Sequence, residues 1–121
     1  MKRVLIADDS DFMLDRLEQT LSGVKDVELV AVCRNGTDAL TAMRNLKPDV
    51  ASLDNKMPGL KGVEVIRKIR KVDKEMKLIL LTFYADAHYR ELAMKAGADC
   101  FLSKSEDFEK IQEVIKQWIN K

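Results

Sequence analysis

Four short apolar runs, each followed by polar residues, constrain the fold of this chain more than any other feature of its sequence. The runs and the residues that follow them are Val4–Ala7 with Asp8 and Asp9, Val50–Leu53 with Asp54, Leu78–Leu81 with Thr82, and Cys100–Ser103 with Lys104. Runs without polar alternation are typical of strands buried on both faces of a parallel sheet. Because parallel strands have their carboxyl ends at one edge of the sheet, these polar side chains are predicted to gather there.

The segments between the runs have the apolar spacing of helices. After the first strand, Leu14, Leu17 and Leu21 fall on one helical face, with Ser10 as N-cap and Gly23 as the stop. A further strand is predicted over Val27–Cys33, with one side formed by Val27, Leu29 and Ala31. The next helix is predicted to be capped by Thr37 and ended by Pro48, and to bury Ala39, Leu40, Met43 and Leu46.

The second half of the chain repeats this alternation. A helix follows the Met57-Pro58-Gly59 loop and buries Val63, Ile66 and Ile69, with Arg67, Lys68, Arg70 and Lys71 outside. A strand is predicted over Lys77–Leu81, and the helix after it, with Leu92, Ala93 and Ala96 on one face, stops at Gly97. The last helix is predicted to open at Ser105 and to bury Phe108, Ile111, Ile115 and Trp118.

Five strands alternating with five helices predict an α/β fold, a (βα)5 doubly wound five-stranded parallel sheet with right-handed crossovers. The 121 residues suffice for one domain, so we expect a single domain over residues 1–121. The flavodoxin-like strand order 2-1-3-4-5 places the first and third strands side by side at the switch point. Asp8, Asp9 and Asp54 then converge at one edge.

Composition excludes several classes of function. The net charge of +1 does not favour nucleic acid or an anionic membrane as a partner. No apolar stretch approaches the ~20 residues of a membrane span, and the amino-terminal run is too short for a signal peptide. Cys33 and Cys100 are expected to be buried free thiols on strands at opposite edges, which favours a cytoplasmic location. The only histidine, His88, is expected on an exposed helix face.

The residues at the predicted edge suit phosphoryl chemistry. Three clustered carboxylates repel one another, and Mg²⁺ would neutralise them because it prefers oxygen ligands and binds beside phosphate. Asp54, at the end of a central strand, could attack phosphorus and form an acyl phosphate. Lys104 and Thr82 could then contact the phosphoryl oxygens as cation and hydroxyl donor. Taken singly, each residue has a plainer interpretation, such as a helix cap for Asp8 and Asp9.

Four motifs of the chain resemble the receiver domain of two-component response regulators. They are VLIADDS at 4–10, DVASLDNKMPGLKG at 49–62, LILLT at 78–82 and KAGADCFLSK at 95–104. The resemblance covers the whole chain and implies that a sensor histidine kinase or a phosphotransfer protein phosphorylates Asp54. It also implies a phosphoacceptor that promotes its own phosphotransfer and dephosphorylation, and therefore not an enzyme.

The same resemblance assigns roles to single residues. It implies that Mg²⁺ is held by Asp9, Asp54 and the backbone carbonyl of Lys56, with Asp8 assisting through water. It makes Thr82 and Phe101 the switch pair, and Lys104 a phosphoryl contact. The surface changed by the switch would be formed by the fourth helix, the fifth strand and the fifth helix, where a downstream target protein binds. On this interpretation the chain is a single-domain regulator.

Three positions depart from the family's usual pattern. Phe83 stands where a small residue is usual, and we expect its ring to be buried beside the phosphoryl pocket and to narrow access. Ser105 stands where a proline with a cis peptide bond is usual, which implies a trans loop or a strained one, because a cis bond before a non-proline residue costs about 2.5–4 kcal/mol. Lys56 and Tyr84 are expected to flank the approach of hydrolytic water.

Three alternatives remain at the level of sequence. A receiver-like binding module could act without phosphorylation if Phe83 blocks the site. A phosphatase of the haloacid dehalogenase type requires a second aspartate two residues after the nucleophile, where Lys56 stands. A flavodoxin-like flavin carrier requires a phosphate-binding loop after the first strand, and Asp8 and Asp9 would repel that phosphate.

Overall fold

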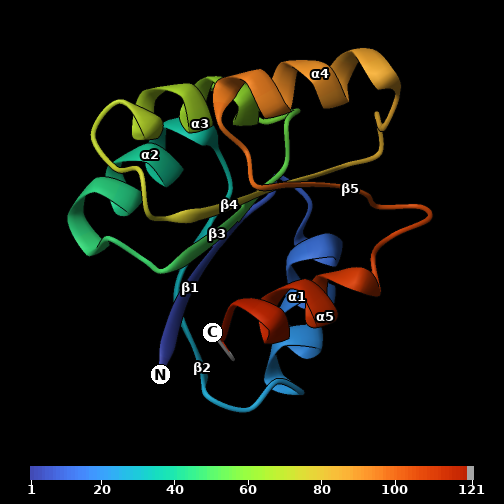
Figure 1. The fold of residues 1–121 in the computed structure, drawn as a ribbon. Helices are drawn as coiled ribbons and strands as arrows, with labels where there is room; N and C mark the ends of the chain where they lie inside the picture. The colour runs from blue at the N-terminus through green and yellow to red at the C-terminus, as the bar shows by residue number, and fades with distance from the viewer. Residues whose placement is uncertain (120–121) are drawn as a thin grey trace.

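The computed structural model describes residues 1–119, in which strands and helices alternate (Figure 1). The strands are β1 (Lys2–Ala7), β2 (Val27–Cys33), β3 (Val50–Leu53), β4 (Lys77–Thr82) and β5 (Cys100–Ser103). The helices are α1 (Asp11–Ser22), α2 (Gly36–Leu46), α3 (Gly62–Arg70), α4 (Ala87–Ala96) and α5 (Lys110–Ile119). Residues 120–121 of the predicted domain lie outside the described residues. No helix within 1–119 has the length and apolar character needed to cross a bilayer.

The sheet has the predicted order, β2-β1-β3-β4-β5, with every neighbouring pair parallel. The register aligns the carboxyl ends of the central strands, because Ala7 pairs with Leu53 and Leu53 pairs with Leu80. Backbone hydrogen bonds continue this alignment beyond the strands. Asp54 N donates to Ala7 O at 3.0 Å, and Lys104 N donates to Thr82 O at 2.9 Å. The polar residues after the strands therefore start from one edge.

Helices cover both faces of the sheet, which gives three layers. Helices α1 and α5 lie on one face, and α2, α3 and α4 lie on the other (Figure 1). The residues of β1 alternate between the two layers of core, with Leu5 packed on the α2–α3–α4 side and Ile6 on the α1–α5 side. Burial on both faces explains why the strands read as continuous apolar runs.

Strand β2 departs from the predicted alternation. Val4 pairs with Leu29 but Leu5 pairs with Ala31, so Val30 is an extra residue in β2. A β-bulge of this kind reverses the facing of the residues that follow it. Val27 and Leu29 accordingly share the α1–α5 side, as predicted, whereas Ala31 packs on the opposite side, so the prediction is wrong for Ala31.

Local hydrogen bonds fix most of the helix ends. Ser10 Oγ accepts from Met13 N at 3.3 Å, as predicted, and Gly97 ends α4 with a φ of +114°, a conformation that favours glycine. The cap of α2 was wrongly predicted. Asn35 Oδ1 accepts from Asp38 N at 2.7 Å, so Asn35 is the N-cap and Thr37 lies inside the helix.

Three further predictions about the helices are wrong. Leu46 is 37% exposed, because it is the last residue of α2 and lies beyond the buried face. Helix α5 begins at Lys110 rather than at Ser105, after a series of turns, although Phe108 is buried as predicted. Arg70 lies largely buried instead of pointing outward, since its guanidinium bonds to backbone carbonyls and to Asp99.

Candidate functional site

A pocket of about 200 Å³ opens at the carboxyl edge of the sheet, between the loops after β1, β3, β4 and β5. It is lined by Asp8, Asp9, Ser10, Met13, Asp54, Lys56, Thr82, Phe83, Tyr84 and Lys104. All the predicted site residues except Phe101 therefore lie around one cavity. The strand register brings them together, although they span almost a hundred positions of sequence.

Two carboxylates and one ammonium are buried at the floor of this pocket. Asp8 is 1% exposed, Asp54 6% and Lys104 4%, whereas Asp9 is exposed at the mouth. Lys104 Nζ lies 2.5 Å from Asp8 Oδ2 and 3.2 Å from Asp54 Oδ2. A single cation thus pairs with both buried carboxylates, a contact between protein groups that sequence reasoning did not predict.

The carboxyl of Asp54 has a pKa above its usual value. Burial is the largest cause, because it penalises the charged form. The ammonium of Lys104 lowers this pKa, and the neighbouring charge of Asp8 raises it again. Lys104 therefore offsets only part of the cost of ionising Asp54, and a further cation at the site would favour the carboxylate.

The geometry of the acidic residues fits a divalent metal ion. Asp8, Asp9 and Asp54 each offer a carboxylate oxygen, and these oxygens lie within 4.8 Å of one another. Hard oxygen ligands of this kind suit Mg²⁺, which is bound through a few carboxylates, carbonyls and waters. Lys56, whose backbone carbonyl was predicted to join this set, lines the same pocket.

The residues expected to act as a switch lie side by side on β4 and β5. Thr82 is fully buried, and its Oγ1 accepts a hydrogen bond from Tyr84 N at 3.1 Å. Phe101 pairs in register with Leu80 and is buried in the core on the α4 side. The guanidinium of Arg90, on α4, lies 5.1 Å from the centre of the Phe101 ring. Phe101 therefore lies two positions out of register with Thr82, which pairs with Ser103, and it contacts α4 through Arg90.

The residues after Thr82 form one wall of the pocket. The prediction that Phe83 is buried is wrong, because the residue is 58% exposed. Its ring nevertheless lines the pocket, with Lys104 Nζ 5.2 Å from the ring centre. Lys56 Nζ donates to Tyr84 Oη at 3.3 Å, so these two residues meet across the mouth.

The loop after Lys104 contains a functional candidate that sequence reasoning missed. The Lys104–Ser105 peptide bond is trans, the simpler of the two expected forms. Asp107 Oδ2 accepts a hydrogen bond from Ser103 N at 3.0 Å, and this bond ties the start of α5 to the end of β5. An acidic residue three positions after the lysine was the only available signal, and it was interpreted as part of a helix start.

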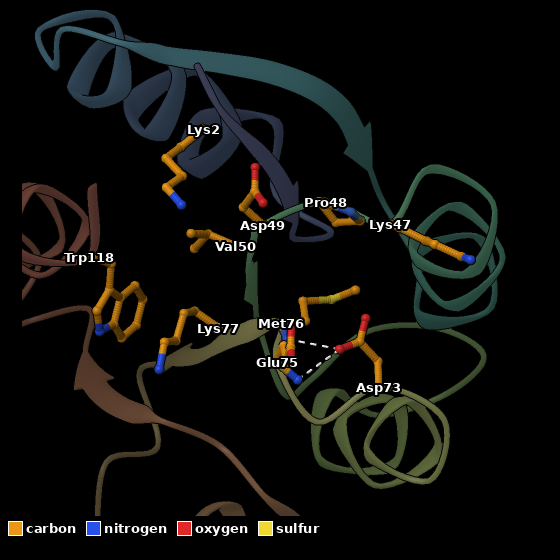
Figure 2. Close-up of a pocket in the computed structure, with 10 residues that line it drawn as sticks. All are labelled: Lys2, Lys47, Pro48, Asp49, Val50, Asp73, Glu75, Met76, Lys77 and Trp118. Atoms are coloured by element: carbon orange, nitrogen blue, oxygen red, sulfur yellow. Dashed lines mark hydrogen bonds between the residues drawn. The ribbon is translucent and has the colours of Figure 1, made fainter. Parts of the chain in front are cut away.

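A larger hollow, of about 360 Å³, lies at the opposite, amino-terminal edge of the sheet (Figure 2). Its charged lining is balanced, with three lysines and three acidic residues. Two of those acids are already engaged by backbone amides. Asp49 Oδ2 accepts from Arg3 N at 2.8 Å, and Asp73 Oδ1 accepts from Glu75 N and Met76 N. This hollow therefore differs from the carboxyl-edge pocket, in which several carboxylates point toward one another around a single lysine.

The parallel sheet and the acidic pocket at its carboxyl edge define a flavodoxin-like α/β protein. The family model described as the response regulator receiver domain matches residues 4–116. The chain belongs to the family of response regulator receiver domains, which confirms the predicted family and its place in two-component systems.

Named relatives and a solved structure agree with this assignment. The response regulator GacA of Pseudomonas aeruginosa is 31% identical over 97% of this chain and 55% of its own length. A protein-glutamate methylesterase/protein-glutamine glutaminase of Methanospirillum hungatei is 34% identical over 94% of the chain and 34% of its own length. A DNA-binding response regulator of the LuxR family from Staphylococcus aureus superposes with a TM-score of 0.90 at 30% identity, covering 97% of this chain and 98% of that one. The chain thus spans a third to about half of the two curated relatives.

Proposed function

We propose that this receiver domain is a phosphorylation-dependent switch in which Asp54 accepts a phosphoryl group from a histidine kinase or a phosphotransfer protein. The observation that carries the proposal is the position of Asp54. Its carboxylate ends a central strand, lines an open pocket, and lies beside Lys104 and two further acids. Asp8 lines the same pocket and also pairs with Lys104, but it follows β1 rather than the middle strand β3, and its Oδ1 already accepts a hydrogen bond from Ser10 N at 2.9 Å.

The transfer step follows from these contacts. A carboxylate oxygen of Asp54 attacks the phosphorus of a phosphohistidine, the new O–P bond forms as the P–N bond breaks, and the imidazole leaves with a proton. Lys104 Nζ, held 3.2 Å from Asp54 Oδ2, is placed to pair with a phosphoryl oxygen. Thr82 can turn its hydroxyl from Tyr84 N toward another phosphoryl oxygen. Catalysis of this kind depends mainly on positioning and on spreading charge.

The metal that fits this site is Mg²⁺, which Asp8, Asp9, Asp54 and the backbone carbonyl of Lys56 would hold. When bound, it neutralises the charge that develops on the phosphoryl oxygens. Asp9, exposed at the mouth, and Asp8, buried beside Lys104, supply the carboxylates that surround Asp54. Burial is the main reason why the pKa of Asp54 is raised, and the neighbouring charge of Asp8 adds to this effect.

We further propose that the signal leaves through the surface of α4, β5 and α5, by contact with a target protein. Phe101 lies on the α4 side of the sheet, one strand away from Thr82, and Arg90 packs on the Phe101 ring. Once Thr82 turns toward the phosphoryl group, the vacated space favours a different packing of Phe101 and so of α4. The free thiols Cys33 and Cys100 support a reducing, cytoplasmic setting for this exchange.

The alternative is a binding module that acts without phosphorylation, and the exposed position of Phe83 argues against it, because the ring leaves the pocket open. Incubation with a small acyl-phosphate donor and Mg²⁺ distinguishes the two. A gain of one phosphoryl mass supports the switch. A chain that takes no phosphoryl group from the donor, or from any histidine kinase offered, supports the binding module.

A further inference from the structure

The place of Lys104 depends on how the chain leaves β5. Its side chain enters the pocket to reach Asp8 and Asp54, and it is almost completely buried. On the amino side, the residue is anchored to β4, because Lys104 N donates to Thr82 O at 2.9 Å. On the other side the chain turns away from the sheet, and the ammonium stays in position only if that turn is fixed.

Asp107 closes this turn through a reciprocal pair of hydrogen bonds with Ser103. Asp107 Oδ2 accepts from Ser103 N at 3.0 Å, and Asp107 N donates to Ser103 O at 2.8 Å. The two bonds enclose a five-residue loop with Lys104 inside it. The other carboxylate oxygen of Asp107 lies 3.0 Å from Lys110 Nζ, which ties the same side chain to the first turn of α5.

Serine hydroxyls reinforce the loop from within. Ser103 Oγ and Ser105 Oγ lie 3.0 Å apart, and Ser103 Oγ accepts from Glu106 N at 3.3 Å. A proline at position 105 would restrict φ through its ring but could supply no hydroxyl. In this chain the same stretch is held by side-chain hydrogen bonds instead. Such bonds depend on particular side chains, so single substitutions can loosen the loop.

We infer that Asp107 is a positioning residue for phosphoryl transfer: it closes the loop of residues 103–107 and so holds the Lys104 ammonium between Asp8 and Asp54. Asp107 itself lies outside the pocket lining and makes no contact with Asp54. Its effect on transfer therefore passes through Lys104. The inference rests on the proposed transfer to Asp54. It adds that transfer requires a residue outside the pocket, Asp107, to keep the loop after β5 closed.

The test compares initial rates of labelling by a small acyl-phosphate donor in Mg²⁺ for a set of matched variants. Asp107→Ala should slow labelling roughly tenfold or more, because a misplaced cation no longer meets the phosphoryl oxygens. Asp107→Asn keeps an oxygen that accepts from Ser103 N and should stay close to wild type. Glu106→Ala removes an acidic residue from the same loop, one whose side chain makes no hydrogen bond or ion pair within residues 1–119, and should leave the rate unchanged.

Epistasis with Lys104 separates positioning from a general structural role. In a Lys104→Ala background, Asp107→Ala should cause no further slowing, because the group that it positions is gone. Equal slowing with and without Lys104 would overturn the inference. So would an Asp107→Asn variant as slow as Asp107→Ala. If Asp107→Ala does not fold, Ser105→Ala, a substitution at an exposed position of the same loop, replaces it. Loss of one neutral hydrogen bond should slow labelling roughly two- to tenfold. No slowing in this variant would overturn the inference.

Urea unfolding of the same variants keeps the two claims distinct. Suppose that the wild type never labels but that Asp107 and Lys104 are coupled in the free energy of unfolding. That result would support the positioning of Lys104 by Asp107 and overturn the proposed function. Labelling of the wild type with no coupling in either measurement would sustain the proposed function and overturn the positioning.

Discussion

The ammonium of Lys104 decides the electrostatics of the pocket, because it pairs with Asp8 and Asp54 at once. Two buried carboxylates share one buried cation, so the cluster carries excess negative charge. Burial, which penalises the charged form, raises the pKa of Asp54, and the charge of Asp8 raises it further. Functional sites often retain such destabilising charge because it serves binding. The negative charge of the site is thus only partly balanced when the site is empty, and it is better balanced when the site holds a cation and a phosphoryl group.

A pH-dependent loss of stability follows from the raised pKa of Asp54. The folded chain holds this proton more tightly than the unfolded chain, in which the pKa of the carboxyl is near its ordinary 3.8. Stability should therefore fall as the pH rises from that value through the folded pKa. Asp54→Asn should lack this loss and be about 1 kcal/mol more stable than wild type at pH 7 without metal. Urea unfolding between pH 4 and pH 7 measures the difference, and an equal pH profile for both proteins would contradict the argument.

The position of Phe83 leads to a second prediction about a single residue. Its exposed ring stands over one side of the pocket, 5.2 Å from Lys104 Nζ, so it limits approach without closing the site. Phe83→Ala should raise the rate of labelling by a small acyl-phosphate donor severalfold. Because the ring is mostly exposed, the free energy of unfolding should change by less than about 1 kcal/mol. Equal labelling rates would show that the ring does not restrict access.

At the scale of elements, Arg70 joins three segments at the amino-terminal edge of the sheet. From the end of α3 its guanidinium donates to Gly97 O at 2.8 Å and Met76 O at 2.6 Å, and it pairs with Asp99 at 2.6 Å. Asp99 Oδ2 also accepts from Leu78 N at 2.8 Å, so the pair fixes the start of β4 as well. Gly97 is required here, because a Cβ would lie 2.5 Å from Arg70 Cγ.

Substitution of Arg70 should therefore destabilise the fold without touching the pocket. Arg70→Ala should lower the free energy of unfolding by about 2 kcal/mol, since it removes charge-assisted bonds to several partners. Arg70→Lys should recover only part of this, because a lysine lacks the planar fork. Arg67→Ala, at an exposed position of the same helix, is the control and should lie within about 0.5 kcal/mol of wild type. Denaturant titration measures all three, and an Arg70→Ala variant as stable as the control would contradict this role.

The surface of α4, β5 and α5 supplies a prediction about signalling. Helix α4 packs on the core through the small residues Ala93 and Ala96, and its Arg90 lies over the Phe101 ring, so a change in Phe101 bears on this helix. Addition of beryllofluoride, a phosphoryl mimic, with Mg²⁺ should shift amide NMR signals in the loops after β3, β4 and β5 and then along residues 84–108. Shifts confined to the neighbourhood of Asp8, Asp9 and Asp54 would show that no switch connects the pocket to this surface.

The elements show which features the sequence could predict. Apolar runs identified the strands Val50–Leu53 and Cys100–Ser103, and the apolar residues spaced along Val27–Cys33 identified a third, all with the bounds that the structure gives. The bulge at Val30 was not predictable, because it depends on pairing with β1 and leaves no mark on local composition. The start of α5 was placed too early, since Ser105 and the acids after it look like a helix cap but form a loop around Lys104.

At the scale of the whole molecule, the strand order β2-β1-β3-β4-β5 determines the site. It brings β1 and β3 together, so Asp8 and Asp54 lie at neighbouring strand ends, and it places Thr82 and Lys104 on the next two strands. The sequence predicted this convergence from the pattern of strands alone. It did not predict the pairing of Lys104 with both acids or the exposure of Phe83, because these depend on side-chain directions that only the folded loops establish.

The opposite edge of the sheet has no comparable chemistry. The hollow there carries equal numbers of lysines and acids (Figure 2), and backbone amides donate to Asp49 and Asp73. Parallel sheets of this kind separate function from structure by edge: loops at the carboxyl ends carry the chemistry, and contacts such as those of Arg70 stabilise the amino ends. The molecule therefore concentrates its chemistry in one pocket around Asp54.

The most direct test of that claim is the intact mass of the chain after incubation with a small acyl-phosphate donor and Mg²⁺. Wild type and an Asp15→Ala control, altered at an exposed position of α1, should each gain one phosphoryl group. Asp54→Ala should gain none, because the attacking carboxylate is absent. Labelling of Asp54→Ala at the wild-type rate would contradict the assignment of Asp54 as the phosphoacceptor.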